Sequence, residues 1–154
     1  MGVEIRNIGD PVLETELVDA LRSSGFDPEQ RSDVIVLRGV GHHEGDRSVD
    51  MEIDLIEMDS FRVLQFRSLL RTEPAGFQQA SLAAIRGNGA CAIPKFDVVE
   101  LDRDLPREHR FGIRASFHLY ADHLSRQELR VMLMLFLKEV DAIDNELAEM
   151  VSPN

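Results

Sequence analysis

The alternation of apolar and polar residues predicts three consecutive strands in the first half of the chain. Residues 33–38 form a short apolar run between turn residues, and residues 49–55 alternate apolar and acidic side chains. The apolar members of the second run are Val49, Met51, Ile53 and Leu55. A period of two with one polar side is typical of an antiparallel strand with one face in water. After a turn, residues 61–70 supply a third strand whose inward set is Leu64, Phe66 and Leu70, so we expect a meander.

Helical spacing predicts one helix before this meander and one after it. The first begins at Asp10–Pro11, an N-cap acceptor followed by a proline that suits the first helical position, and ends at Gly25. The second begins at residues 72–74 and ends at residues 87–89. The apolar face of the second helix is predicted to consist of Phe77, Ala80, Ala84 and Ile85.

Two further strands are predicted over residues 93–101 and 111–119, joined by a charged connection that contains Pro106. Together with a last helix, the element order is α-β-β-β-α-β-β-α. This order predicts an α+β fold in which helices flank an antiparallel sheet. With 154 residues, the chain is expected to form a single domain over residues 1–154, with a core of about residues 10–151.

The last helix has the strongest signals. Ser125 and Glu128 form a capping box, and an apolar seam follows at helical spacing. The seam consists of Leu129, Leu133, Phe136, Val140, Ile143, Leu147 and Met150. A second apolar set lies outside the seam, and its members are Val131, Met134, Leu135 and Leu137. Because a helix that is apolar on both sides is usually buried on both sides, this set predicts an interface with a second copy or a client protein. The alternative is a core helix within one subunit.

Composition narrows the classes of function. The formal net charge is -11, and the 17 Lys and Arg residues do not cluster, which argues against nucleic-acid and anionic-lipid partners. The longest apolar run, residues 131–137, is too short to span a bilayer. The N-terminus lacks a signal pattern, and the single cysteine, Cys91, cannot form an internal disulfide. We therefore expect a cytoplasmic protein.

A small acidic chain with this element order resembles the type III secretion chaperone fold. Within that fold it resembles the YbjN-type family of proposed bacterial sensory transduction regulators, over roughly residues 11–150. The resemblance depends on Asn88, on Ile93-Pro94-Lys95-Phe96, on the two strands that follow, and on Leu124–Ser125. The family tends to carry an asparagine pair after the middle helix; Asn88 matches the second, and Arg86 stands at the first. The resemblance implies a dimeric α+β module with a binding or regulatory role, and it transfers no catalytic residue.

Histidines are the first candidates for a metal site. His42 and His43 are adjacent, so on extended backbone their side chains point apart, and a structural zinc site needs about four ligands. His118 and His123 could join them only through folding. The alternatives are a solvated loop, which we favour, and a small-molecule or metal sensor with a pocket between sheet and helix. Residues 39–45 miss the G-x-G-x-x-G spacing by one residue and lead into a strand, so they predict no dinucleotide site.

No catalytic constellation stands out either. The acidic residues Asp50, Glu52, Asp54, Glu57 and Asp59 offer carboxylates for a hydrolase. Catalytic carboxylates need a cleft that shifts their pKa, whereas alternation places the first three on a solvent face. Cys91 lacks a histidine at a recognisable spacing and is interpreted as a structural thiol. Ser68, Ser81 and Ser116 lack a G-x-S-x-G motif. The sequence therefore predicts no catalytic, cofactor-binding or metal-binding residue, and favours a non-enzymatic protein-binding module.

Overall fold

The computed structural model describes residues 11–23, 25–31, 34–40, 49–122 and 124–152. Its helices are α1 (Pro11–Ser23), α2 (Phe77–Ala90) and α3 (Arg126–Val151). Its strands are β1 (Pro28–Arg31), β2 (Val34–Val40), β3 (Val49–Glu57), β4 (Arg62–Leu69), β5 (Lys95–Glu100) and β6 (Phe111–Tyr120). A short 3-10 helix, η1 (Arg107–His109), precedes β6. The predicted α+β architecture with an antiparallel sheet is confirmed.

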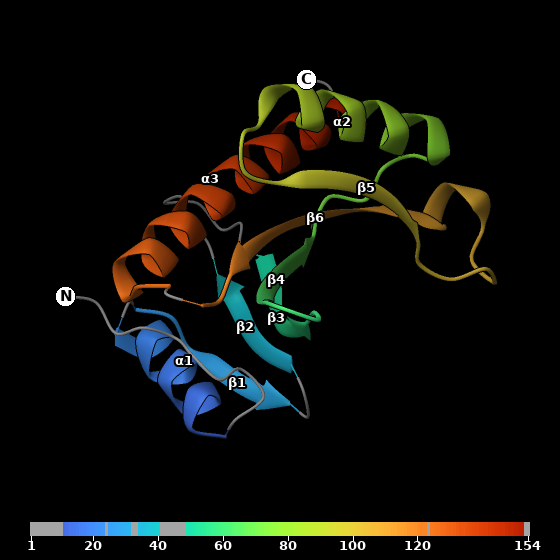
Figure 1. Cartoon of the computed structure of the whole chain (residues 1–154). Coiled ribbons are helices and arrows are strands. Elements are labelled where there is room, and N and C mark those ends of the chain that lie inside the picture. Colours follow the sequence, from blue (N-terminus) through green and yellow to red (C-terminus); the bar gives the residue numbers. More distant parts are fainter. Residues whose placement is uncertain (1–10, 24, 32–33, 41–48, 123, 153–154) are drawn as a thin grey trace.

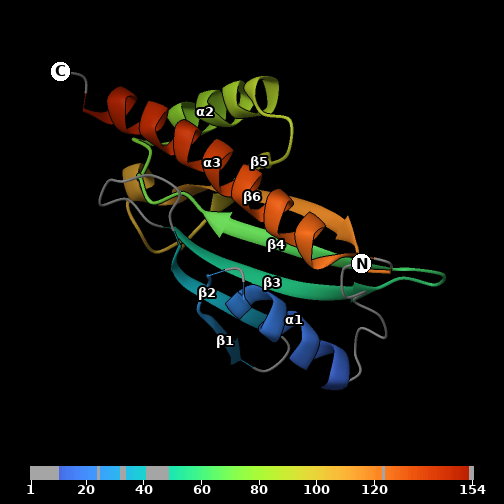
Figure 2. The ribbon, with the colours of Figure 1, turned by 90° about the vertical axis from the view of Figure 1, so that its left-hand side faces the viewer.

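The six strands form one sheet in the order β1-β2-β3-β4-β6-β5, and every neighbouring pair is antiparallel. The helices pack on one face of this sheet, with α1 beside β1, α3 across the middle and α2 over β5 (Figures 1 and 2). The opposite face carries no helix in the part of the chain that the structure describes. We call it the open face.

The meander is confirmed but has one strand more than predicted. The additional strand, β1, has the sequence Pro-Glu-Gln-Arg, which lacks an apolar alternation, and only its first residue is buried. It becomes a strand through its ladder with β2, in which Glu29 lies opposite Val36. Tertiary pairing, which local sequence does not encode, therefore decided this element.

The core lies between the sheet and the helices, as the alternation predicts. Met51 and Ile53 of β3 are buried, as are Leu64 and Phe66 of β4 and the following Leu70. Phe66 stacks on Phe117 with ring centroids 4.4 Å apart, and Phe117 lies 4.6 Å from Phe136 of α3. These rings connect the middle of the sheet to the last helix. The side chain of Val49 lies outside the described residues.

Helix α2 departs from the prediction at both ends. It begins at Phe77, after Gly76 with φ 112°, rather than at residues 72–74, and it continues through Gly87, Asn88 and Gly89 to Ala90. Its buried residues are Ala80, Ala83, Ala84 and Gly87. Phe77 and Ile85, which were predicted to face the core, are exposed, because the helix turns its small residues toward β5. This close approach explains why a glycine stands at position 87 within the helix, because a Cβ there would lie 2.6 Å from Cδ2 of Phe96.

Helix α3 begins as predicted, since the Oγ of Ser125 accepts a hydrogen bond from the N–H of Glu128 over 3.1 Å. The predicted seam is confirmed from Leu129 to Leu147, and Met150 is half-buried. The structure adds two buried residues, Leu137 and Asp144. Because α3 contacts both the sheet and α2, its buried arc is wider than a single seam.

Candidate interaction surface

The second apolar set of α3 divides between the surface and the core. Val131, Met134 and Leu135 are 36% to 47% exposed, whereas Leu137 is 1% exposed and belongs to the hydrophobic core. Leu137 is therefore removed from the predicted interface, because it contacts this chain's own interior. The remaining three residues follow helical spacing and form one patch on the solvent side of α3, which we call the α3 patch.

Charged residues border the α3 patch along the helix. Arg130 lies one turn before Met134, and Lys138 lies one turn after it. Glu128 precedes Val131 by three residues. All three charged residues are exposed. An apolar centre with charged neighbours resembles the core-and-rim arrangement of protein interfaces.

A second apolar patch lies on the open face, and none of its residues belongs to the predicted interface. It occupies the end of the sheet where β3, β4 and β6 meet. Its members are Ile56, Met58, Phe61, Val63 and Tyr120, and we call it the Tyr120 patch. Tyr120 is 70% exposed, and its ring lies 5.5 Å from that of Phe61 in an edge-to-face arrangement. The alternation of the strands could have indicated this patch, because residues that alternate with the buried Leu64 along β4 face the other side of the sheet.

The centre of the open face carries the acidic row of β3, which offered carboxylates for a hydrolase. Arg67 pairs with Asp54 over 2.7 Å and with Glu52 over 3.3 Å. Asp50 and Glu52 are exposed, as predicted, and Asp54 is half-buried. These contacts are those of a charged, solvated sheet surface. Asp59 is exposed in the turn beside the Tyr120 patch, and Glu57 is exposed at the end of β3, where alternation with Ile56 turns it to the other face of the sheet.

Two of the depressions on the surface of the described residues bear on the predicted pocket between sheet and helix. One of about 460 Å³ lies on the open face and is lined by residues that include Arg31, Arg67 and Arg114. The other, of about 540 Å³, lies between the start of α2 and the start of β6, and so between a helix and the sheet. The described histidines, His109 and His118, line neither of them.

The remaining candidates for chemistry give no site. His42, His43 and His123 lie outside the described residues, as does most of the glycine-containing segment 39–45. Among the described residues, no group of three His, Cys, Asp or Glu side chains could hold a metal ion. Cys91 is half-buried, and burial, followed by the hydrogen bond and charge of Glu139, raises the pKa of its thiol to about 12. A thiol with that pKa is protonated at neutral pH, in accord with a structural role.

Comparisons with known proteins give a fold and no family assignment. No family model matches the chain, and no curated protein matches it in sequence. None of the described helices is long and apolar enough to cross a membrane. The chain is similar to the crystal structure of YbjN from E. coli, a proposed transcription regulator, with a TM-score of 0.64 and 14% sequence identity. The similarity covers 90% of this chain and 93% of YbjN, so it extends over nearly the whole of the fold. The resemblance to type III secretion chaperones stays a prediction.

Proposed function

We propose that this chain is a non-enzymatic protein-binding module with a regulatory or chaperone-like role, which acts in the cytoplasm as a homodimer. The observation that carries the proposal is the α3 patch. Val131, Met134 and Leu135 are exposed on a helix whose other side is already buried in its own core. The likeness in fold to YbjN, a proposed transcription regulator, supports a regulatory role over an enzymatic one.

The order of residues around the α3 patch favours a twofold, antiparallel pairing of two copies. Val131 and Leu135 lie two residues before and after position 133, and Glu128 and Lys138 lie five residues before and after it. In a twofold interface, residue i of one copy contacts residue j of the other, and the reverse contact forms as well. A twofold axis that meets the exposed side of α3 at the level of residue 133 brings Val131 against Leu135 of the second copy. It also brings the exposed Glu128 near the exposed Lys138, so that two ion pairs flank the apolar contacts.

The α3 patch forms the centre of such an interface and not the whole of it. Specific dimers bury roughly 800 Å² on each partner, which is more than three half-exposed side chains supply. Gln127 and Ala142, exposed one turn before and about two turns after the patch, extend the same side of the helix. The helix is long enough for this contact, since its 26 residues span roughly 39 Å at about 1.5 Å per residue.

The test is the native mass of the purified chain, measured by light scattering or native mass spectrometry. We expect a mass near twice 17.4 kDa. Leu135→Asp should give a monomer, because a carboxylate would be buried in the apolar centre. Ile85→Asp is the matched control, because Ile85 is a 69% exposed apolar residue on another helix and should leave the mass unchanged.

A charge exchange tests the register of the pairing. Glu128→Lys and Lys138→Glu should each weaken the dimer, since each places like charges together, and the double variant should restore it. A wild-type monomer, or a folded Leu135→Asp variant with the wild-type mass, would show that subunits do not meet at the α3 patch. A double variant as weak as the sum of the single variants would exclude the antiparallel register.

A further inference from the structure

We infer that the Tyr120 patch is a docking site for a segment of another protein that combines apolar residues with lysine or arginine side chains. The inference rests on the proposed protein-binding function and names the chemistry of the partner. The patch lies on the open face of the sheet, whereas the α3 patch lies on the helical side, so a segment bound here would not compete for the α3 patch (Figure 1).

Strand register assembles the patch from three segments. Ile56 lies opposite Val63 in the ladder of β3 and β4, and Val63 lies opposite Tyr120 in the ladder of β4 and β6. Residues opposite each other in neighbouring antiparallel strands have side chains on the same face, with Cβ atoms roughly 5 Å apart. The turn from β3 to β4, closed by a hydrogen bond from the N–H of Met58 to the carbonyl of Phe61 over 2.9 Å, adds two more apolar side chains. Figure 2 shows this turn reaching out from the end of the sheet.

The composition of the patch is that of a binding surface. Tyr120 is 70% exposed and Met58 and Phe61 are also exposed, although the chain has enough apolar residues to build its core without them. Tyrosine, phenylalanine and methionine are enriched at the centres of protein interfaces, where tyrosine often contributes a large share of the binding energy. The edge-to-face contact of Phe61 and Tyr120 holds two rings in place before a partner arrives, which lowers the entropy lost on binding.

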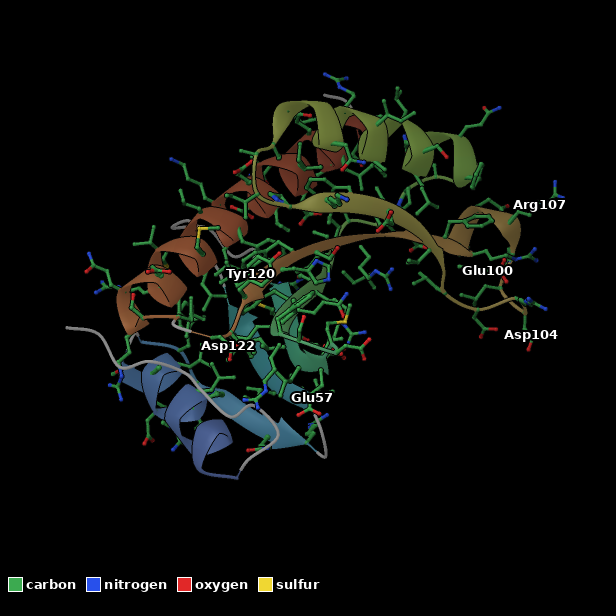
Figure 3. The ribbon with its side chains drawn as sticks, viewed as in Figure 1. Glu57, Glu100, Asp104, Arg107, Tyr120 and Asp122 are labelled. Carbon is green, nitrogen blue, oxygen red and sulfur yellow. The ribbon has the colours of Figure 1, made fainter. Side chains whose placement is uncertain are left out.

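The charges around the patch select the partner. Asp59 follows Met58 directly, and Asp122 follows Tyr120 by two residues; Tyr120 and Asp122 are labelled in Figure 3. Arg62 is the single basic residue between positions 56 and 63. Carboxylates around an apolar centre attract lysine and arginine, and the exposed ring offers a cation–π contact. The net charge of -11 adds a long-range attraction for the same kind of partner.

The single tyrosine makes the test specific to this patch. The chain has one tyrosine and no tryptophan, so its tyrosine fluorescence reports Tyr120 alone. The probes are two synthetic peptides without tyrosine or tryptophan. They share the same leucine and isoleucine positions, and one carries lysine and arginine where the other carries glutamate. We expect the basic peptide to protect the fluorescence from acrylamide in a saturable manner, and the acidic peptide to give no protection. Raising the salt from about 0.05 M to about 0.5 M should reduce the protection, because exposed charges are screened.

Variants locate the contact, with the anisotropy of a labelled basic peptide as the readout. Tyr120→Ser and Phe61→Ser should weaken binding about tenfold or more, as truncation of an interface aromatic commonly does. Asp122→Asn should weaken it severalfold. Ile85→Ser, which changes an equally exposed apolar residue on α2, should have no effect.

Three outcomes would overturn the inference: equal protection by both peptides, protection by neither, or unchanged binding by Tyr120→Ser. Protection that rises with protein concentration in the absence of peptide would replace it with self-association at this patch. The outcome is separable from the proposed dimer. If the peptides fail while Leu135→Asp still dissociates the dimer, only this docking site is lost.

Discussion

The side-chain amide of Asn88 forms two hydrogen bonds with the backbone of a single residue, Phe96. Its Nδ2 donates to the Phe96 carbonyl over 2.9 Å, and its Oδ1 accepts from the Phe96 N–H over 2.7 Å. Phe96 lies in β5, an edge strand of the sheet, so the amide takes the place that a further strand would occupy. Unpaired edges recruit foreign strands, and Asn88 closes part of this edge while fixing the end of α2 to the sheet.

Replacing this amide tests its contribution to stability. Asn88→Ala leaves the N–H and carbonyl of Phe96 without their partner, and we expect the free energy of unfolding to fall by about 1–3 kcal/mol. Urea denaturation measures the change. Arg86→Ala, at an exposed position on the same helix, is the control and should change stability by less than about 0.5 kcal/mol. Similar losses for both variants would mean that the amide contributes nothing specific.

The two glycines near the end of α2 should respond to alanine with opposite signs. A Cβ on Gly87 would lie 2.6 Å and 2.9 Å from two carbons of the buried Phe96 ring, whereas a Cβ on Gly89 would have no atom within 4 Å. Overpacking costs about 1–3 kcal/mol and alanine gains about 1 kcal/mol over glycine in a helix. We expect Gly87→Ala to lower the melting temperature and Gly89→Ala to raise it. A stabilised Gly87→Ala variant would show that the Phe96 ring moves aside at little cost.

The thiol of Cys91 should be protected from alkylation in the folded chain. Burial is the main cause of its raised pKa of about 12, and the hydrogen bond and charge of Glu139 and the charge of Glu146 add to it. At pH 9, iodoacetamide should react at least about a hundredfold more slowly with the native chain than with the denatured chain, because the thiolate is the nucleophile. Equal rates would contradict this account.

The same shift has a consequence for stability at high pH. The folded state holds the thiol proton more tightly than the unfolded state, so unfolding releases a proton above the unfolded pKa of about 9. The stability contributed by Cys91 is therefore complete below pH 9 and is lost as the pH rises toward 12. Cys91→Ser should lessen this slope, and denaturation curves at pH 8 and at about pH 10 compare the two chains.

Asp144 should anchor the segment between β4 and α2 to the last helix. It is fully buried, and its Oδ1 accepts a hydrogen bond from the N–H of Thr72 over 2.9 Å. Asp144→Ala removes the acceptor, and we expect a loss of about 1–3 kcal/mol in urea denaturation. Glu149→Ala, at an exposed position of the same helix, should be close to neutral. Equal effects of the two substitutions would show that this contact does not fasten the segment.

Strands and helices with one solvent-exposed face could be predicted from the sequence, because their buried residues recur at regular intervals. The alternation around Met51 and Ile53 identified β3, and that around Ile113 and Phe117 identified β6. The start of α3 could be predicted as well, since the helix cap is a local interaction between Ser125 and Glu128. Elements set by distant partners could not be predicted from the sequence. β1 exists through its pairing with β2, and residues 72–76, in which the N–H of Thr72 donates to Asp144, precede α2 as a non-helical segment.

The candidate surfaces divide in the same way. The sequence by itself determined that α3 carries more apolar residues than one face can bury, because side-chain polarity and helical spacing are local properties. Only the tertiary structure decided that Leu137 contacts the core while Val131, Met134 and Leu135 remain exposed, since that depends on where α2 and the sheet meet the helix. The Tyr120 patch is likewise a product of register. Ile56 comes from β3, Phe61 from the turn between β3 and β4, and Tyr120 from β6. They become neighbours only when the ladders between β3, β4 and β6 have formed.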